Sequence, residues 1–119
     1  DIGIVGNGAG LVMTTVDMLY LKKLKPLNFL DIGGGKDTVI KKALDIIASK
    51  KPKKIFINIF GGITRCDIIA EGIVKFNKTN NTPIIIRMFG NNYENANLIL
   101  SNNNIDVETE LKVAVSKLK

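Results

Sequence analysis

The 119-residue chain contains no histidine and no tryptophan, and its single cysteine is Cys66. Without histidine, the chain cannot supply a Ser-His-Asp triad, a histidine metal cluster or an imidazole acid or base. One cysteine excludes an internal disulfide and is typical of a reducing compartment. Cys66 precedes an expected helix, where a thiol pKa can fall, but we favour a small packed residue. A reaction that needs an imidazole therefore requires another chain or domain.

Long hydrophobic runs are also missing, because no apolar stretch approaches the roughly 18–20 residues that a membrane span needs. The net charge is +6, but the lysines are scattered and form no arginine-rich stripe. With two tyrosines and no tryptophan to stack on bases, the composition predicts no nucleic-acid partner and no membrane partner. The chain opens at Asp1 without a methionine or a basic leader, so we expect a fragment of a longer protein.

Strand-like apolar runs alternate with helical periodicity along the whole chain, as in one α/β domain covering residues 1–119. We expect strands at residues 2–5, 27–32, 55–60, 83–88 and 105–107, and helices at residues 11–24, 37–47, 65–77, 94–100 and 109–118. This alternation is typical of a parallel sheet with helices on both faces. We predict a flavodoxin-like three-layer domain with a five-stranded parallel sheet in the order 2-1-3-4-5.

Three of the turns between a strand and a helix are rich in glycine, at residues 6–10, 33–35 and 61–62. The carboxyl ends of parallel strands meet at one edge of a sheet, and glycine lets a ligand approach the backbone closely. We therefore predict a negatively charged or carboxylate ligand at this edge. The alternative is that the glycines serve only the geometry of tight turns.

The stretch IFINIFGGITRCDIIAEG combines a strand, a glycine turn and the start of a helix. The first backbone N–H groups of a helix lack internal partners, and the helix dipole favours an anion there. We predict an anion-accepting helix N-terminus formed by Gly61, Gly62, Thr64 and Arg65. A second interpretation makes Thr64 and Asp67 a capping pair for the same helix, and the two interpretations can coexist.

The first glycine turn can also be interpreted as part of a different class of protein. Gly6 and Gly8 follow a strand, and Asp31 ends the next strand where a ribose-binding acid would lie. A dinucleotide-binding oxidoreductase module is therefore the alternative function. The pattern departs from G-x-G-x-x-G because the third glycine is Gly10, and Leu11 occupies the position that the motif requires.

Four separated motifs carry a more specific signal: NGAGLVMTTVD, NFLDIGGG, NIFGGITRCDIIAEGI and IIIRMFGNN. In this order they strongly resemble the beta subunit of succinyl-CoA synthetase, specifically its C-terminal CoA-ligase domain. The resemblance runs from about Ile2 to the last expected helix. It implies a succinate–CoA ligase (NDP-forming) that works with an alpha subunit. That enzyme interconverts succinyl-CoA, phosphate and a nucleoside diphosphate with succinate, CoA and the triphosphate.

The resemblance also implies where the substrates bind. Contacts to succinate and phosphate fall on Asn7 and on the turn Gly62, Ile63 and Thr64, shared with the alpha subunit. A phosphohistidine of the alpha subunit carries the phosphoryl group, so no catalytic residue and no metal site is expected in this chain. CoA is expected on the alpha subunit, and ATP or GTP with magnesium in an ATP-grasp domain N-terminal to Asp1. The isolated domain is then expected to be inactive.

Some features depart from the resemblance or extend it. Phe89 stands where related sequences commonly have glutamate in an R-L-E-G run, which leaves this position without an assigned polar role. The run Arg65-Cys66-Asp67 is more similar to ATP-using than to GTP-using forms. The asparagine- and lysine-rich composition is typical of an AT-biased eukaryotic genome. We therefore expect the mitochondrial matrix, or the bacterial cytoplasm if the source is prokaryotic.

Overall fold

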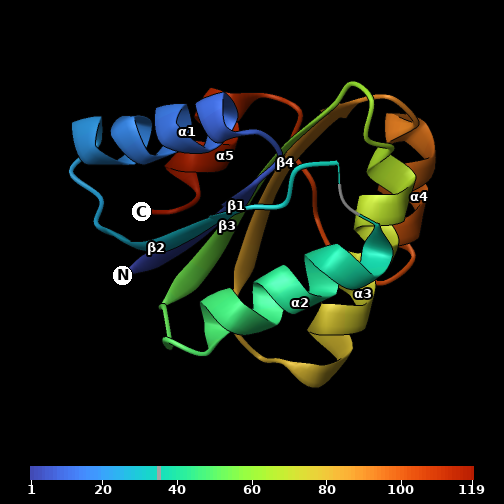
Figure 1. Cartoon of the computed structure of the whole chain (residues 1–119), viewed down its shortest axis with the longest axis horizontal. Coiled ribbons are helices and arrows are strands. Elements are labelled where there is room, and N and C mark those ends of the chain that lie inside the picture. Colours follow the sequence, from blue (N-terminus) through green and yellow to red (C-terminus); the bar gives the residue numbers. More distant parts are fainter. Residues whose placement is uncertain (35) are drawn as a thin grey trace.

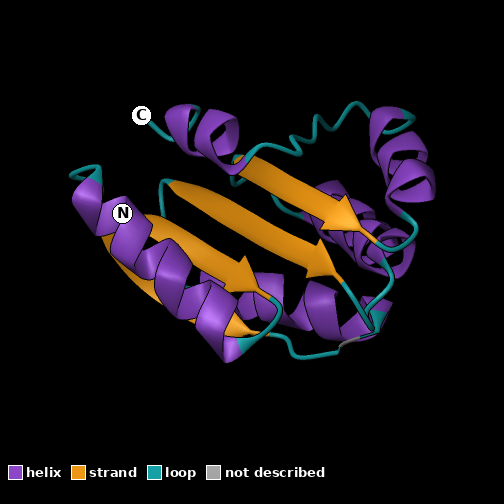
Figure 2. Ribbon diagram, turned by 90° about the horizontal axis from the view of Figure 1, so that it is seen from above, coloured by secondary structure: helices purple, strands orange, loops and turns teal. Residues whose placement is uncertain are grey.

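The computed structural model describes residues 1–34 and 36–119. Within these residues a four-stranded parallel sheet carries helices on both faces (Figures 1 and 2). The strands are β1 (Ile2–Gly6), β2 (Pro26–Asp31), β3 (Lys54–Gly61) and β4 (Ile84–Gly90). The helices are α1 (Ala9–Leu21), α2 (Asp37–Ala48), α3 (Cys66–Thr79), α4 (Tyr93–Ser101) and α5 (Leu111–Ser116).

The two faces of the sheet carry separate hydrophobic clusters. Ile4 and Phe56 pack against α1 and α5, whereas Val5 and Ile57 belong to the larger cluster under α2, α3 and α4 (Figure 1). Successive strand residues point to opposite faces, so a strand covered on both sides must be apolar at nearly every position. This requirement explains the continuous apolar runs of β1 and β3.

The strand order β2-β1-β3-β4 confirms the predicted parallel arrangement for these strands. Ile4 of β1 is paired with Phe29 of β2 on one side and with Phe56 of β3 on the other. The chain winds outward in both directions from β1 and β3, which therefore form the topological switch point. Ligands of open parallel sheets gather at the carboxyl ends of such strands.

The prediction of a fifth strand at residues 105–107 is wrong for the described chain. The segment runs beside β4 but meets it only at one isolated bridge, between Arg87 and Glu108. Glu108 N donates to Ile86 O, and Met88 N donates to Glu108 O, both at 2.9 Å. The segment therefore lies next to β4, as predicted, but a single bridge does not make it a strand of the sheet.

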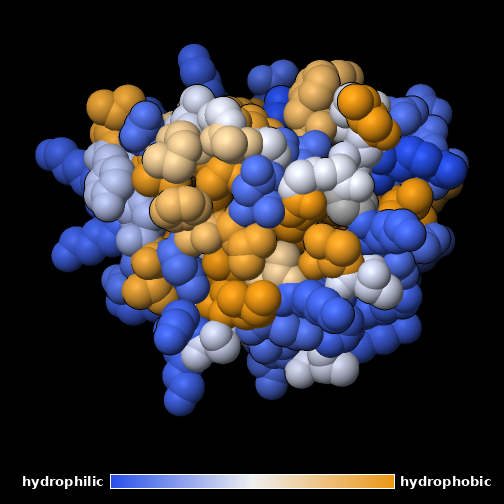
Figure 3. Space-filling model, in the orientation of Figure 1, coloured by the Kyte–Doolittle hydropathy of each residue, from blue (hydrophilic) through white to orange (hydrophobic). Residues whose placement is uncertain are grey.

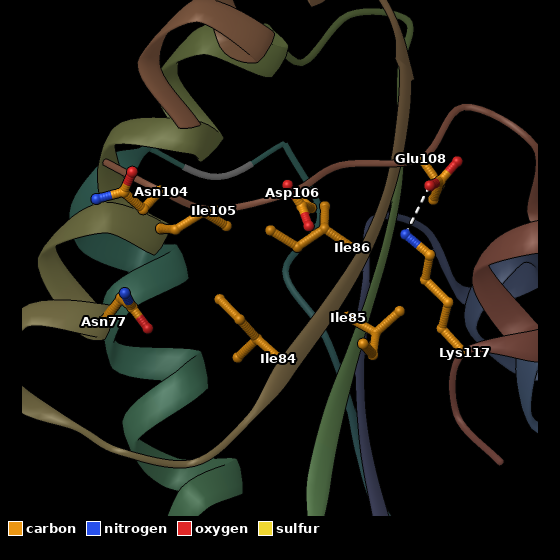
Figure 4. A pocket seen from close by; sticks show the side chains of 9 residues that line it. All are labelled: Asn77, Ile84, Ile85, Ile86, Asn104, Ile105, Asp106, Glu108 and Lys117. Atoms are coloured by element: carbon orange, nitrogen blue, oxygen red, sulfur yellow. Dashed lines mark hydrogen bonds and ion pairs between the residues drawn. The ribbon is translucent and has the colours of Figure 1, made fainter. Parts of the chain in front are cut away.

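A hollow of about 260 Å³ lies where the additional ladder would run (Figure 4). Ile84 and Ile86 line it from β4, and Ile105 and Asp106 line it from the opposite side. Ile105 N donates to Leu100 O at 2.9 Å to close the end of α4, and the Ile105 side chain is buried among the helices. Because this backbone donor is already used, the segment stands away from the edge of β4.

The first helix ends earlier than its apolar periodicity predicts. The periodicity continues to Leu24, but α1 stops at Leu21 because Lys23 adopts a left-handed backbone conformation with φ 61°. Leu24 N then donates back to Leu19 O at 2.9 Å. A left-handed residue that closes the last turn in this way is a usual helix terminus.

The amino edge of the sheet gathers lysines that are scattered in the sequence. They occupy the connections from α1 to β2 and from α2 to β3, at Lys22, Lys23, Lys25, Lys50, Lys51 and Lys53. Both chain ends lie at this edge: Lys53 N donates to Asp1 O at 2.8 Å, and Lys54 Nζ donates to Leu118 O at 3.2 Å. No described helix combines the length and the apolarity that a membrane crossing requires.

Candidate functional site at the carboxyl edge of the sheet

The three glycine-rich turns meet at the carboxyl edge, as predicted. Asp31 Oδ1 accepts hydrogen bonds from Gly8 N at 2.7 Å and from Gly33 N at 2.8 Å, which joins the first two turns. A Cβ placed on Gly34 would lie 3.7 Å from Thr64 Oγ1, so the second turn also contacts the third. The edge is therefore one continuous surface of backbone and small side chains.

The joining role of Asp31 bears on the dinucleotide-binding hypothesis. Its Oδ1 is used by two backbone amides, so the position of this acid is explained by the contact between two turns. Gly10 lies in the first turn of α1 with open space around it, and the helix does not need a glycine there to pack. Gly35, the last glycine of the second turn, lies outside the described residues.

Asn7 is fixed beside the third turn by two hydrogen bonds to β3. Its Nδ2 donates to Phe60 O at 2.7 Å, and its Oδ1 accepts from Phe60 N at 3.0 Å. The side chain thus extends the β1–β3 pairing beyond its last backbone pair, Gly6 with Asn58. An amide has two N–H donors and two acceptor lone pairs, so one of each is left for a ligand.

Gly61 supports the turn from behind. It is buried, and a Cβ at this position would lie 2.6 Å from Cys66 Sγ and 3.0 Å from Thr64 O. Asn91 ties the turn to the end of β4: its N–H donates to Gly61 O at 2.6 Å, and its carbonyl accepts from Cys66 N at 2.9 Å. The first backbone donor of α3 is therefore used inside the domain.

Several residues after Gly62 have backbone N–H groups that make no hydrogen bond within the described chain. Gly62 is exposed, and the Ile63 side chain is 100% exposed. Among the described residues, the backbone N–H groups of Ile63, Thr64, Arg65 and Asp67 have no hydrogen-bond partner. Ile63 and Arg65 are exposed, whereas Thr64 and Asp67 are buried. The four groups lie at the start of α3, a helix of 14 residues, where the dipole adds a positive potential that favours an anion.

The side chains of this helix start differ from the predicted capping pair. Arg65 is the N-cap, and no side-chain capping hydrogen bond is present, so the expected cap by Thr64 is wrong. Asp67 instead receives Arg65 Nη2 at 2.7 Å and Arg65 Nε at 3.1 Å, and also accepts from Ile68 N. Burial raises the pKa of Asp67, but the hydrogen bonds from Arg65, Asn92 and the Ile68 N–H, together with the charge of Arg65, outweigh burial and lower it.

Cys66 is a packed residue. Its side chain is fully buried, and burial raises the pKa of the thiol above its ordinary value. The sulfur lies 3.6 Å from Phe89 O, between the ends of β3 and β4. This environment fits the preferred interpretation and disfavours a thiolate nucleophile.

A buried polar network beneath the edge was not predicted from the sequence. Asn58 Nδ2 donates to Thr15 Oγ1 at 2.9 Å, and the Thr15 hydroxyl donates to Leu11 O at 2.7 Å. Arg87 Nη1 donates to Asn58 Oδ1 at 3.3 Å, and its Nε donates to Thr109 O at 3.1 Å. The available signal was Asn58 itself, because an asparagine inside an apolar central strand requires buried partners.

Fold and site together define a class of protein: a parallel α/β domain whose carboxyl edge offers backbone donors to an anion. The chain has no histidine, and its described residues contain no group of three potential metal-ligating side chains. A family model described as CoA-ligase matches residues 5–119, and the chain belongs to this family.

Several relatives with similar sequences are beta subunits of a ligase. Succinate–CoA ligase [ADP-forming] subunit beta of Rickettsia bellii (strain OSU 85-389) is 47% identical over 124 residues, covering 99% of this chain and 32% of the relative. The subunit of the same name from Rickettsia akari is 49% identical over 111 residues, covering 90% and 29%. Subunit beta 2 of Archaeoglobus fulgidus is 45% identical over 102 residues, covering 84% and 27%.

The similarity confirms the resemblance noted in the sequence. The chain spans between 27% and 32% of the length of these relatives. The organisms are prokaryotes, so the comparisons give no support to the predicted mitochondrial matrix.

Proposed function

We propose that this chain is the C-terminal CoA-ligase domain of a succinate–CoA ligase beta subunit and acts together with an alpha subunit. The complex interconverts succinyl-CoA, phosphate and a nucleoside diphosphate with succinate, CoA and the triphosphate. The relatives carry ADP-forming in their names, and we propose ADP and ATP as the nucleotides here. We place the phosphohistidine that carries the phosphoryl group on the alpha subunit, as the resemblance implies, because this chain has no histidine of its own to carry it.

The observation that supports this role best is the start of α3. Within the described chain, the N–H groups of Ile63, Thr64 and Arg65 have no hydrogen-bond partner and lie at the start of the helix, where the dipole favours a phosphate oxyanion. Donors that are held in place before the reaction stabilise developing charge without a cost of reorganisation. The domain's backbone is pinned here by Gly61 and Asn91, so the donors keep their positions.

The charge at this helix start is moderate. The Arg65 side chain is 51% exposed, and its ion pair with Asp67 offsets much of its charge. Attraction of the anion therefore depends mainly on the backbone N–H groups and the helix dipole, with Arg65 as a secondary contribution. A site of this strength suits a phosphoryl group in transit, which must also leave.

Asn7 supplies the second half of the proposed substrate contact. Its amide is held beside the turn by Phe60 and keeps one N–H and one lone pair free. We assign these to a carboxylate or thioester oxygen of the substrate. The remaining components lie outside this chain: CoA on the alpha subunit, and nucleotide with magnesium on an ATP-grasp domain of the longer beta chain.

Gly62→Val in the full alpha–beta complex tests the helix start. A Cβ at Gly62 meets no atom within 4 Å, so the branched side chain enters the space proposed for phosphate and leaves the fold intact. We expect the rate of alpha-subunit phosphorylation to fall about a hundredfold, with unchanged thermal stability and unchanged association of the subunits. Normal phosphorylation would contradict the role of the turn. Ligase activity from the 119-residue chain alone would contradict the division of labour between the subunits.

A further inference from the structure

Three aromatic side chains form a row at the same carboxyl edge as the candidate site. Phe60 and Phe89 are the next-to-last residues of β3 and β4, and Tyr93 begins α4; these three residues are called the aromatic row below. The ring centroids of Phe60 and Phe89 are 6.4 Å apart, and those of Phe89 and Tyr93 are 5.8 Å apart, with tilted planes. The Arg87 guanidinium lies 5.9 Å from the centre of the Phe60 ring.

Two of the three rings in the aromatic row are about half exposed, and Tyr93 is partly buried against the core. Phe60 is 50% exposed and Phe89 is 48% exposed. Tilted ring pairs at these distances hold each other in place, so little side-chain entropy remains to be lost on binding. Large, rigid aromatic side chains with this exposure are the residues that most often anchor a protein interface.

The surface around Phe89 contains two hollows, as docking sites often do. One hollow of about 440 Å³ is lined by Phe89, Gly90, Asn92 and Tyr93. Another of about 550 Å³ is lined by Phe89 together with Arg87 and the segment that begins at Thr109. Phe89 lines both hollows, and such a surface can take up side chains of another protein, as interface cores do.

We propose that the aromatic row is the anchor through which this domain binds the alpha subunit. This inference rests on the proposed function and adds the residues that make the contact. Phe60 directly precedes Gly61, so the row is continuous with a turn that needs an imidazole from another chain. A partner that brings its histidine to the turn must cover the neighbouring surface, and the row is the apolar part of that surface.

The position of the chain ends also favours a separate partner. Asp1 and Lys119 lie at the amino edge of the sheet, opposite the carboxyl ends of β3 and β4 (Figure 1). The two ends of the described chain therefore do not cover the aromatic row.

A second apolar surface on the molecule is an alternative binding surface, and it also supplies a control variant. Hydrophobic side chains gather between α1 and α2 (Figure 3), where the edge strand β2 exposes Leu27 and Phe29. Phe29 is 53% exposed, close to the 48% of Phe89, but it belongs to the strand at the other side of the sheet. The same substitution at the two phenylalanines therefore separates a specific anchor from a general effect of charge on an apolar surface.

The test measures the Kd between the full-length beta chain and the alpha subunit for Phe89→Glu, Phe60→Ala and Phe29→Glu. We expect Kd to rise about tenfold or more for each of the first two variants, and to stay within about twofold for Phe29→Glu. All three side chains are about half exposed, so each variant should stay folded, with only a small fall in melting temperature from the lost ring contacts of Phe60 and Phe89. At saturating alpha subunit, Phe89→Glu should recover phosphorylation of the alpha subunit, because the turn itself is intact.

The outcomes distinguish this inference from the proposed function. If the wild-type beta chain does not bind the alpha subunit, the proposed function fails and the anchor with it. If the wild type binds and Phe89→Glu binds equally well, only the anchor is overturned. A wild-type beta chain that dimerises by itself and becomes monomeric on Phe89→Glu would also overturn it, since a second copy would then be the occupant.

Discussion

Asn7 and Phe60 lie 53 positions apart in the sequence and are joined by two hydrogen bonds. The asparagine side chain donates to the Phe60 carbonyl at 2.7 Å and accepts from the Phe60 N–H at 3.0 Å, as a backbone partner would. One residue therefore has two roles: it holds the ends of β1 and β3 together, and it faces the turn proposed for the substrate. Variants at this position must be measured for stability as well as for activity.

Asn7→Asp is expected to weaken the fold. The carboxylate replaces the N–H donor by an anionic oxygen that faces the Phe60 carbonyl, so one hydrogen bond becomes a repulsion. The free energy of unfolding at pH 7 should fall by about 1 kcal/mol, measured by urea denaturation. Asn97→Asp, on the exposed side of α4, is the matched control and should have little effect. Equal effects of the two variants would contradict the structural role of Asn7.

Gly72→Ala is expected to destabilise the contact between α2 and α3. A Cβ at Gly72 would clash with Ile40 Cγ2 and lie 2.5 Å from Asp37 O, a backbone atom that cannot move aside cheaply. We expect the free energy of unfolding to fall by roughly 1–3 kcal/mol, although alanine favours the helix. Gly10→Ala is the control, because open space surrounds that position. It should raise the free energy of unfolding by roughly 0.4–1 kcal/mol.

Thr15→Val tests the buried network beneath the site. The substitution keeps the shape of the side chain but removes the oxygen that accepts from Asn58 Nδ2. An unsatisfied buried amide should lower the free energy of unfolding by about 1–3 kcal/mol. Thr14→Val, one residue earlier on the exposed side of α1, carries the same chemical change and should be nearly neutral. A neutral Thr15→Val would show that Asn58 finds another partner.

Asp67→Asn tests the pH dependence of the helix start. Burial raises the pKa of Asp67, but the Arg65 side chain and the hydrogen bonds from Asn92 and Ile68 together outweigh it, so the pKa in the folded state lies below the ordinary value. A group with a lowered pKa stabilises the fold above its unfolded pKa and loses this contribution as the pH falls through the folded value. The difference in unfolding free energy between the wild type and Asp67→Asn should therefore be constant near pH 7.

The same difference should shrink as the pH falls below about 4, the ordinary range of an aspartate. Denaturation curves of both proteins from pH 7 to pH 2 would measure it. Asp17→Asn, on the exposed side of α1, controls for the loss of one carboxylate from the surface. A difference that grows toward acid pH would contradict the assignment of the ion pair.

The alternation of strands and helices could be predicted from the sequence because it follows from patterns within about ten residues. The β3 run that ends at Gly61 has β-branched and aromatic residues, and the next apolar residues recur at helical spacing. The end of α1 could not be predicted in this way. Its apolar periodicity continues to Leu24, and only the left-handed turn at Lys23 ends the helix.

The prediction of a fifth strand was wrong because of contacts in the tertiary structure. Residues 105–107 have a strand-like composition, but the Ile105 N–H closes α4 and its side chain packs among helices. Competition between two partners for one donor depends on where α4 ends in space. A local pattern carries no information about that competition.

The candidate site divides in the same way. By itself, the sequence determined the family, the glycine turns and the helix start after Gly62, since these depend on contiguous motifs. Only the tertiary structure decided that Asn7 is bonded to Phe60, that the Asn91 carbonyl takes the first donor of α3, and that Arg65 pairs with Asp67. The first two contacts join distant segments, and the third is one of several geometries open to adjacent side chains. Each of these three contacts therefore depends on how the folded chain packs. Short-range periodicity in the sequence carries no information about that packing.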